Sequence, residues 1–156
     1  MKVVIKILLL AMLLLPCSIP ISSKEWRGIV PLHSTRADVE RLLGQGTNWC
    51  KCSYYFNDMN VFFVYSSGDC KNGGSGGWDI PPDTVIRFSI VLKPQPRWAD
   101  LKLDLSKFRK ENDPEIEGIV QYHDDEEGFL IEGDQEIVYG FYYWPSAKDK
   151  KLRCTN

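Results

Sequence analysis

The first apolar residues of the folded region recur at the spacing of a short helix. Val39 and Leu42 fall on one helix face, and Thr35 before them supplies a hydroxyl for the N-cap. Gly44 then provides the left-handed residue that commonly ends a helix. We therefore predict a helix over Arg36–Leu43. Because it has only about two turns, it needs a sheet against which to pack its apolar face.

The pattern then changes to that of β-strands. Aromatic and β-branched residues are concentrated in Cys52–Phe56 and Val61–Tyr65, on either side of an Asn- and Asp-rich turn at 57–60, which indicates a hairpin. After a loop at 66–82, Val85–Leu92 is expected to be a third strand. Its residues alternate, with Ile86, Phe88 and Ile90 on one face and Val85, Arg87, Ser89 and Val91 on the other.

Two prolines, Pro94 and Pro96, mark an internal boundary at 93–97. Beyond it the apolar residues fit a helix spacing, although 101–105 also alternates like a strand; we predict a short helix there. Three strands joined by turns at 124–128 and 133–134 follow: Ile119–Tyr122, Phe129–Ile131 and Ile137–Tyr143. Since Pro145 and a basic tail come after the last of them, we expect that strand at or near a sheet edge.

This order of elements predicts an α+β fold in which short helices pack on antiparallel β-meanders. The chain shows two successive sets of helix and strands, which suggests two helix-plus-three-strand repeats, 24–93 and 97–156, within a single mature domain. The two sets share almost no residue identity, so two ordinary meanders are an equal alternative.

The N-terminus has the three-part pattern of a secretory signal peptide. Two lysines within Met1–Lys6 precede the apolar run Leu8–Leu15, and Pro16–Ser23 is small, polar and helix-breaking. The apolar run is too short for a permanent membrane anchor. We therefore expect residues 1–23 to be removed, with 24–156 acting outside the cytoplasm, either periplasmic or secreted, and with no transmembrane segment after cleavage.

Export determines what the cysteines are expected to do, because disulfides form outside the cytoplasm. Cys17 belongs to the leader, and the proline before it argues against lipid anchoring. The other four, Cys50, Cys52, Cys70 and Cys154, are expected to form two disulfides, for which three pairings exist. If Cys50 and Cys52 lie in one strand they point the same way. Bridges from this pair to Cys70 and to Cys154 are thus favoured.

Composition and spacing exclude several kinds of ligand. The chain has 19 Lys and Arg against 21 Asp and Glu, and a mildly acidic domain is a poor candidate for nucleic-acid binding. Lys71 precedes the glycines at 73–77, the reverse of a phosphate-binding loop, and the acidic turn at 124–128 lacks the ligand spacing of a calcium loop. Zinc held by the cysteines with His33 or His123 is disfavoured by the Cys-x-Cys spacing. No cofactor or metal is predicted.

A catalytic site is not evident in the sequence. His33 lies beside Ser34, but Ser34 and Thr35 begin a helix and no acid is placed behind the histidine by sequence. His123 stands beside the acidic turn, where a surface histidine is the simpler interpretation. A secreted hydrolase with a carboxylate or histidine site is therefore the second hypothesis for function, and a structural protein without a small ligand is the third.

Aromatic residues are the feature with binding potential. They occur consecutively in the strands, so some of them must point away from a one-sided core. Tyr143 and Trp144, at the end of the last strand, are our candidates for an interface, because aromatic residues dominate the binding energy of interfaces. This favours a non-catalytic exported binding or assembly module with a protein or glycan partner.

Two resemblances accompany this interpretation. Residues 31–44 resemble the opening of the SmpA/OmlA (BamE-like) envelope modules, whose architecture the tandem β-lactamase inhibitor protein shares; the resemblance implies a non-catalytic binder. The segments 25–31, 65–70, 78–81 and 147–154 together are similar to a group of exported bacterial proteins with no assigned function. Neither resemblance supplies an active site.

Overall fold

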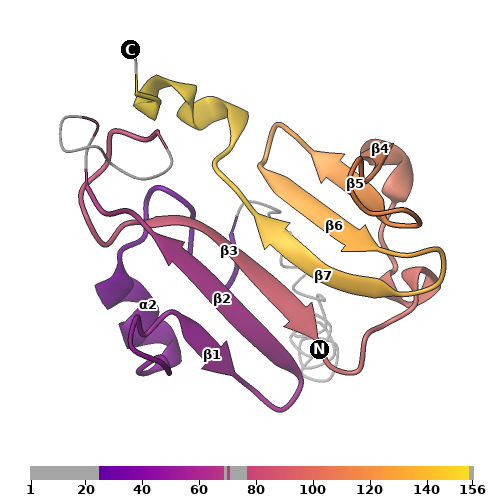
Figure 1. Cartoon of the computed structure of the whole chain (residues 1–156), viewed down its shortest axis with the longest axis horizontal. Coiled ribbons are helices and arrows are strands. Elements are labelled where there is room, and N and C mark those ends of the chain that lie inside the picture. Colours follow the sequence, from indigo (N-terminus) through magenta and orange to yellow (C-terminus); the bar gives the residue numbers. More distant parts are fainter. Residues whose placement is uncertain (1–24, 69, 71–76, 155–156) are drawn as a thin grey trace, which may run out of the picture.

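The computed structural model describes residues 25–68, 70 and 77–154. Its strands form one antiparallel seven-stranded sheet in the order β1-β2-β3-β7-β6-β5-β4 (Figure 1). The strands are β1 (Ser53–Tyr55), β2 (Met59–Tyr65), β3 (Val85–Leu92), β4 (Arg109–Asn112), β5 (Val120–Asp124), β6 (Phe129–Gly133) and β7 (Val138–Tyr143). Two meanders, β1–β3 and β4–β7, are thus joined through the pairing of their last strands, β3 and β7.

The predicted helix is confirmed as α2 (Arg36–Leu43). Thr35 accepts a hydrogen bond from the backbone N–H of Asp38, and the Asp38 carboxylate accepts one from the backbone N–H of Thr35, so both ends of this capping box are satisfied. The backbone N–H of Gly44 bonds to the carbonyl of Glu40 at the other end. The described residues also form the 3₁₀ helices η2 (Trp98–Leu101), η3 (Leu105–Lys107) and η4 (Ala147–Leu152).

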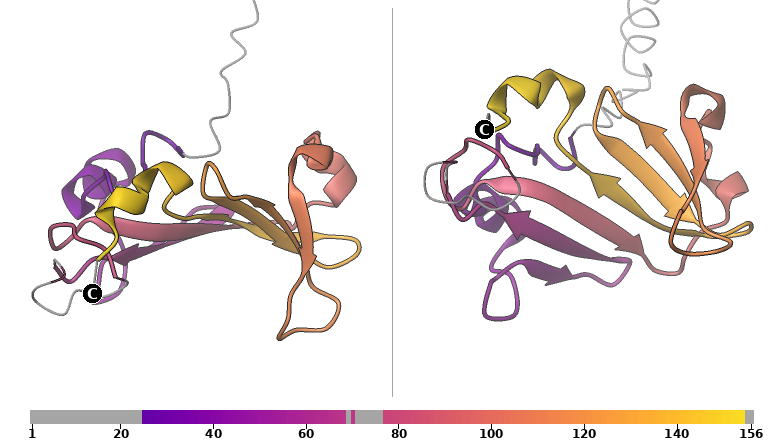
Figure 2. Two further views of the ribbon diagram at one scale, coloured as in Figure 1. Left: turned by 90° about the horizontal axis from the view of Figure 1, so that it is seen from above. Right: turned by 45° about the horizontal axis from the view of Figure 1, so that its top comes forward.

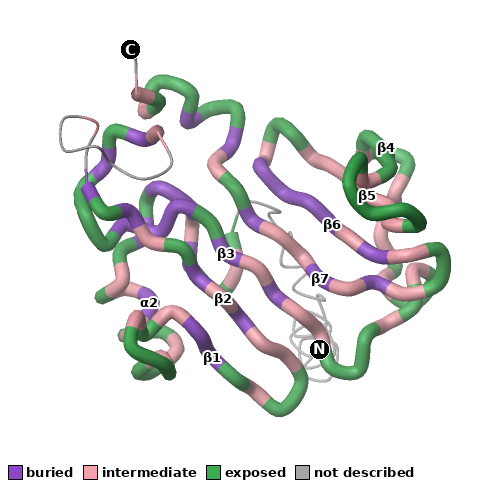
Figure 3. Tube along the Cα trace, in the orientation of Figure 1, coloured by how far each residue is buried: buried purple, intermediate pink, exposed green. Residues whose placement is uncertain are grey.

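One face of the sheet carries the core. Helices α2 and η4 lie on the same side of the sheet in Figure 2, and Figure 3 shows buried positions along the central strands. The largest core cluster joins side chains of this sheet face to residues of α2 and of the segment before it: Ile29, Val39, Tyr54, Val61, Phe63, Val85, Phe88, Ile90, Phe129, Ile131, Val138 and Tyr143. We call this the covered face, and the opposite side the open face.

The second half of the chain differs from the prediction. The apolar segment 98–108 forms two short 3₁₀ helices rather than an α-helix, and an additional strand, β4, brings the second meander to four strands. All four residues of β4 are polar and exposed, so the sequence shows no alternation of apolar residues that would predict a strand there. The fold is therefore more sheet-rich than expected, and the helix-plus-three-strand repeat is not confirmed.

The predicted position of the last strand is wrong. β7 lies in the middle of the sheet, paired with β3 on one side and with β6 on the other. Pro145 follows the strand and therefore removes no hydrogen bond from the ladder. The chain then leaves the sheet for η4, so proline here ends a central strand instead of protecting an edge.

The favoured disulfide pairing is also wrong. Cys50 bonds to Cys52, with 5.2 Å between their Cα atoms, and Cys70 bonds to Cys154. Both Cys50 and Cys52 precede β1, and Lys51 between them has a positive φ of 50°. The two cysteines are thus not alternate residues of one strand, which removes the reason for excluding their bond.

Several predicted features lie outside the described residues, namely the leader 1–23 with Cys17, Lys71, and the glycines at 73–76. Within the described part of the chain, no helix has both the length and the apolar character needed to span a membrane.

Candidate functional site

The open face is defined by strand register, because paired residues of antiparallel strands point to the same side of a sheet. One row crosses the sheet from Phe62 through Ser89, Tyr142, Leu130 and His123 to Arg109. A second row runs from Tyr55 through Asn60, Val91, Gly140, Glu132 and Gln121 to Glu111. The face consequently mixes aromatic and apolar side chains with polar ones over β1–β3, and is mainly polar over β4–β6.

The two candidate interface residues lie in different environments. Tyr143 is on the covered face, only 6% exposed, and its ring stacks on that of Phe88 with 4.4 Å between ring centres. Its ring is therefore part of the core and is not a surface anchor. Trp144 is 37% exposed and lines a groove with Phe62 and Tyr142. Trp144 remains the candidate.

The position of Trp144 is fixed by the turn between β5 and β6. Its backbone N–H donates to the carbonyl of Gly128 at 2.7 Å. Gly128 has a φ of 68°, and a Cβ there would overlap the carbonyl oxygen of Trp144. The predicted turn at 124–128 thus also holds the backbone of Trp144 beside the start of β6.

A pocket of about 420 Å³ lies on one side of Trp144. Trp78 forms part of its wall, together with Val64 and the side chains of two arginines. Arg87 stacks on Trp144, with 4.6 Å from Cζ to the ring centre, and Arg153 stacks on Trp78 at 4.2 Å. Such cation–π contacts hold guanidinium groups in a fixed orientation without neutralising their charge.

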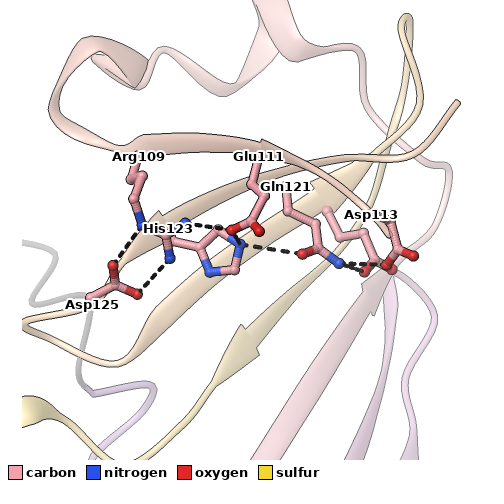
Figure 4. Close-up of polar contacts among 7 residues, drawn as sticks. Arg109, Glu111, Asp113, Gln121, His123 and Asp125 are labelled. Carbon is pink, nitrogen blue, oxygen red and sulfur yellow. Dashed lines mark hydrogen bonds and ion pairs between the residues drawn. The ribbon is translucent and has the colours of Figure 1, made fainter. Parts of the chain in front are cut away.

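A second hollow, of about 360 Å³, lies on the other side of Trp144 and is lined by acidic residues and His123. Figure 4 shows the polar network of β4 and β5 beside it. Arg109 donates to both carboxylate oxygens of Asp125, at 2.9 and 3.1 Å, and also to Glu111. This hydrogen bonding holds the pKa of Asp125 below its usual range, so the carboxylate stays charged at neutral pH.

Gln121 continues the network towards the centre of the sheet. Its amide nitrogen donates to Asp113 at 2.8 Å and to Glu132 at 3.0 Å, and Tyr142 donates to the other oxygen of Glu132 at 3.0 Å. Burial, with a smaller effect from the Glu132 charge, raises the pKa of Tyr142 to about 12. Tyr142 is therefore neutral and a hydrogen-bond donor at any physiological pH.

Sequence reasoning missed one exposed aromatic residue. Trp49 is 96% exposed beside the Cys50–Cys52 disulfide and lines a hollow that also includes Val64. Val64 belongs as well to the pockets around Trp144, whereas Arg36 and Glu40 of α2 line the same hollow as Trp49, so Trp49 lies at the β2 edge between the two faces. The residues around Trp49 show no strand or helix periodicity, and so gave no reason to single it out.

The histidines are placed with partners. His33 Nε2 lies 3.0 Å from the carboxylate of Asp149, which is buried and accepts hydrogen bonds from the backbone and hydroxyl of Ser146. The structure thus supplies the acid that the sequence did not. In a nucleophilic triad, however, the histidine lies between the serine and the acid, whereas here the acid lies between Ser146 and His33. This arrangement ties η4 to the loop before α2.

His123 contacts Gln121 at 3.2 Å and lies 3.8 Å from the carboxylate of Glu111. Within the described residues no three side chains of His, Cys, Asp or Glu are grouped closely enough to share a metal ion. The described cysteines are all in disulfides.

Comparisons of the chain with protein-family models, with curated proteins and with solved structures found no match. The open face itself therefore provides the evidence for function.

Proposed function

We propose that the protein is a non-catalytic binding module that acts outside the cytoplasm and holds a protein partner on the open face of its sheet. One observation supports this proposal above all: helices pack on one face of the sheet, whereas aromatic residues remain accessible to solvent on the other. Apolar side chains left in water on a rigid surface are typical of interaction sites.

The exposed apolar residues support this location. Tyr55, Val64 and Trp144 are each more than one third exposed and belong to the open face, and Trp49 is exposed at the neighbouring edge of the sheet. Tyrosine and tryptophan are enriched at protein interfaces because they bury large rings while keeping a polar group for hydrogen bonding. The predicted leader and the two disulfides favour a location outside the cytoplasm. The resemblance of 31–44 to BamE-like modules favours binding over catalysis.

Site-specific crosslinking can test the proposal. A photoreactive amino acid placed at Val64, which is 40% exposed on the open face, is expected to form an adduct with a partner in cells that produce the full chain. The matched control is Leu42, which is 41% exposed on α2 on the other side of the sheet. Adducts from position 64 but not from position 42 support the proposal. Equal adducts from both, or none from 64, contradict it.

A further inference from the structure

Two arginines, Arg87 and Arg153, face the pocket beside Trp144. In the described part of the chain neither forms an ion pair with a carboxylate, and their guanidinium groups lie over the rings of Trp144 and Trp78. By contrast, Arg109 at the other end of the open face forms ion pairs with two carboxylates. The pocket thus concentrates positive charge in a protein whose net charge is −2.

The two guanidinium groups come from different parts of the chain and are held in place. Arg87 projects from β3, in the middle of the sheet. Arg153 follows η4 and forms a backbone bridge to Trp78, and the next residue, Cys154, is joined to Cys70 by a disulfide. Both arginines therefore keep their positions with no charged partner among the described residues, and this lowers the entropic cost of binding one.

We propose that this arginine pocket binds a carboxylate of the protein partner, either an Asp or Glu side chain or a C-terminal carboxylate. The inference depends on the proposed function, because it names the chemistry of the partner at the same face. A guanidinium presents paired N–H donors that match the two oxygens of a carboxylate. The apolar wall, made by Val64, Ile86 and Pro145, limits access of water and strengthens such a bond.

The geometry favours a protein over an acidic sugar. Sugars bind aromatic residues by stacking on an open ring face, but Trp78 is only 6% exposed and Arg153 lies over its ring. Arg87 covers one face of Trp144 in the same way. Nucleic acid is also disfavoured, because the carboxylates of Asp125 and Glu111 lie at the other end of the open face and would repel a long polyanion.

The test uses the purified chain with its disulfides intact and three probes. The probes are a capped hexaglutamate peptide, an acetylated hexaalanine peptide with a free C-terminal carboxylate, and hexagalacturonate. We expect the first or second peptide to bind by calorimetry and to shift the indole N–H signals of Trp78 and Trp144 in NMR spectra. Which peptide binds identifies the source of the carboxylate.

Variants establish whether the arginines are responsible. Arg87→Gln and Arg153→Gln are each expected to weaken peptide binding about tenfold. Arg87→Lys, which keeps the charge but loses the paired donors, is expected to weaken it less. The matched control is Arg27→Gln, because Arg27 also stacks on a tryptophan, at 4.8 Å from the ring centre of Trp26, but on the covered side, where Trp26 packs against Phe88. This variant is expected to bind normally.

Several results would overturn the inference. The inference fails if both pocket variants bind the peptide normally, or if the Arg27 variant weakens binding equally. It also fails if only hexagalacturonate binds, or if no probe binds. Should Arg87→Gln lower the melting temperature, Arg153→Gln and Arg87→Lys still decide the matter. The crosslinking result at position 64 is separate, so a partner captured there in the absence of probe binding would retain the proposed function and reject the arginine pocket.

Discussion

The two faces of the sheet contain similar residues and use them differently. Each carries tyrosine, phenylalanine and branched aliphatic side chains from the same strands, yet one forms the core and the other meets solvent. Tyr143 and Trp144 are neighbours in sequence and lie on opposite sides of this division. Aromatic content alone therefore does not identify an interface. Whether an aromatic residue is buried or exposed depends on which face of the sheet the helices cover.

The polar groups of the two faces differ as well. On the covered face the ring of Tyr143 is stacked among other rings, and burial alone raises its pKa to about 12. On the open face Tyr142 has the same raised pKa, but Glu132 contributes to it through its charge and a hydrogen bond. The covered face thus stabilises the fold by packing, whereas the open face arranges charges and donors around an accessible aromatic centre.

The largest expected effect is the loss of a covered-face ring. Tyr143→Ala removes a buried side chain and leaves a cavity, so we expect the free energy of unfolding to fall by about 4 kcal/mol. Trp144→Ala, at a partly exposed site, is expected to cost about 1 kcal/mol. Urea unfolding of both variants measures the difference. Equal losses in the free energy of unfolding would contradict the division into a packed face and an exposed face.

The two disulfides are expected to differ in the same measurement. The Cys70–Cys154 bond spans 84 residues in sequence, whereas Cys50–Cys52 spans 2. Because a crosslink restricts the unfolded chain more when its loop is longer, Cys70→Ser with Cys154→Ser should lower the free energy of unfolding by about 3 kcal/mol. Cys50→Ser with Cys52→Ser should cost about 1 kcal/mol. A larger effect of the second pair would show that the short loop stabilises the fold by contacts rather than by restricting the chain.

Sequence periodicity was sufficient for the elements that bury an apolar face. It located α2, β2 and β3 because each repeats or alternates apolar residues, although in β3 the adjacent Val85 and Ile86 are both buried, in two different clusters. It failed for β4, whose polar residues are held at the sheet edge by backbone pairing with β5. It also failed for the cysteines, since their pairing depends on a positive φ at Lys51 that no pattern of apolar residues records.

The site was predictable only in part. Trp144 was a candidate because it ends an aromatic strand, and the alternation of β3 placed Arg87 on the face opposite Phe88. Nothing in the sequence brought Arg153 to that face, because its position depends on the path of η4 and on the backbone bridge to Trp78. Residues distant in sequence that meet through tertiary structure leave no local signal.

Alkaline pH provides a test of how the two tyrosines are held. The pKa values of Tyr142 and Tyr143 are raised to about 12 in the folded state, above the value near 10 of an unfolded chain. The folded state therefore retains the phenolic proton more tightly, and the resulting stabilisation is fully present below about pH 10 and is lost as pH rises towards 12. Urea unfolding at pH 9 and pH 11.5 should show this loss.

The variant Glu132→Gln separates the two tyrosines. It removes the charge that contributes to the raised pKa of Tyr142 and leaves the burial of Tyr143 unchanged. NMR signals assigned to single tyrosine rings should therefore show Tyr142 titrating at lower pH than in the parent protein and Tyr143 unaltered, with a smaller shift at Tyr139, whose pKa the Glu132 charge also raises. A shift of Tyr143 as large as that of Tyr142, or no shift of Tyr142, would mean that Glu132 does not act on Tyr142 locally.

The smallest expected effect on stability concerns the edge strand β4, where both faces are exposed. Arg109→Ala removes a two-pronged ion pair with Asp125, but since both side chains are more than half exposed we expect the free energy of unfolding to change very little. The neighbouring Lys110 lies on the covered side, near the ring of Tyr122, and Lys110→Ala should have a similarly small effect. NMR titration distinguishes them: the pKa of Asp125 should rise towards its ordinary range in the Arg109 variant alone, because the Arg109 hydrogen bonds are the main cause of its lowering. A stability loss several times larger in the Arg109 variant would mean that the polar network holds β4 on the sheet, and the open face would then contribute to the fold as well as to binding.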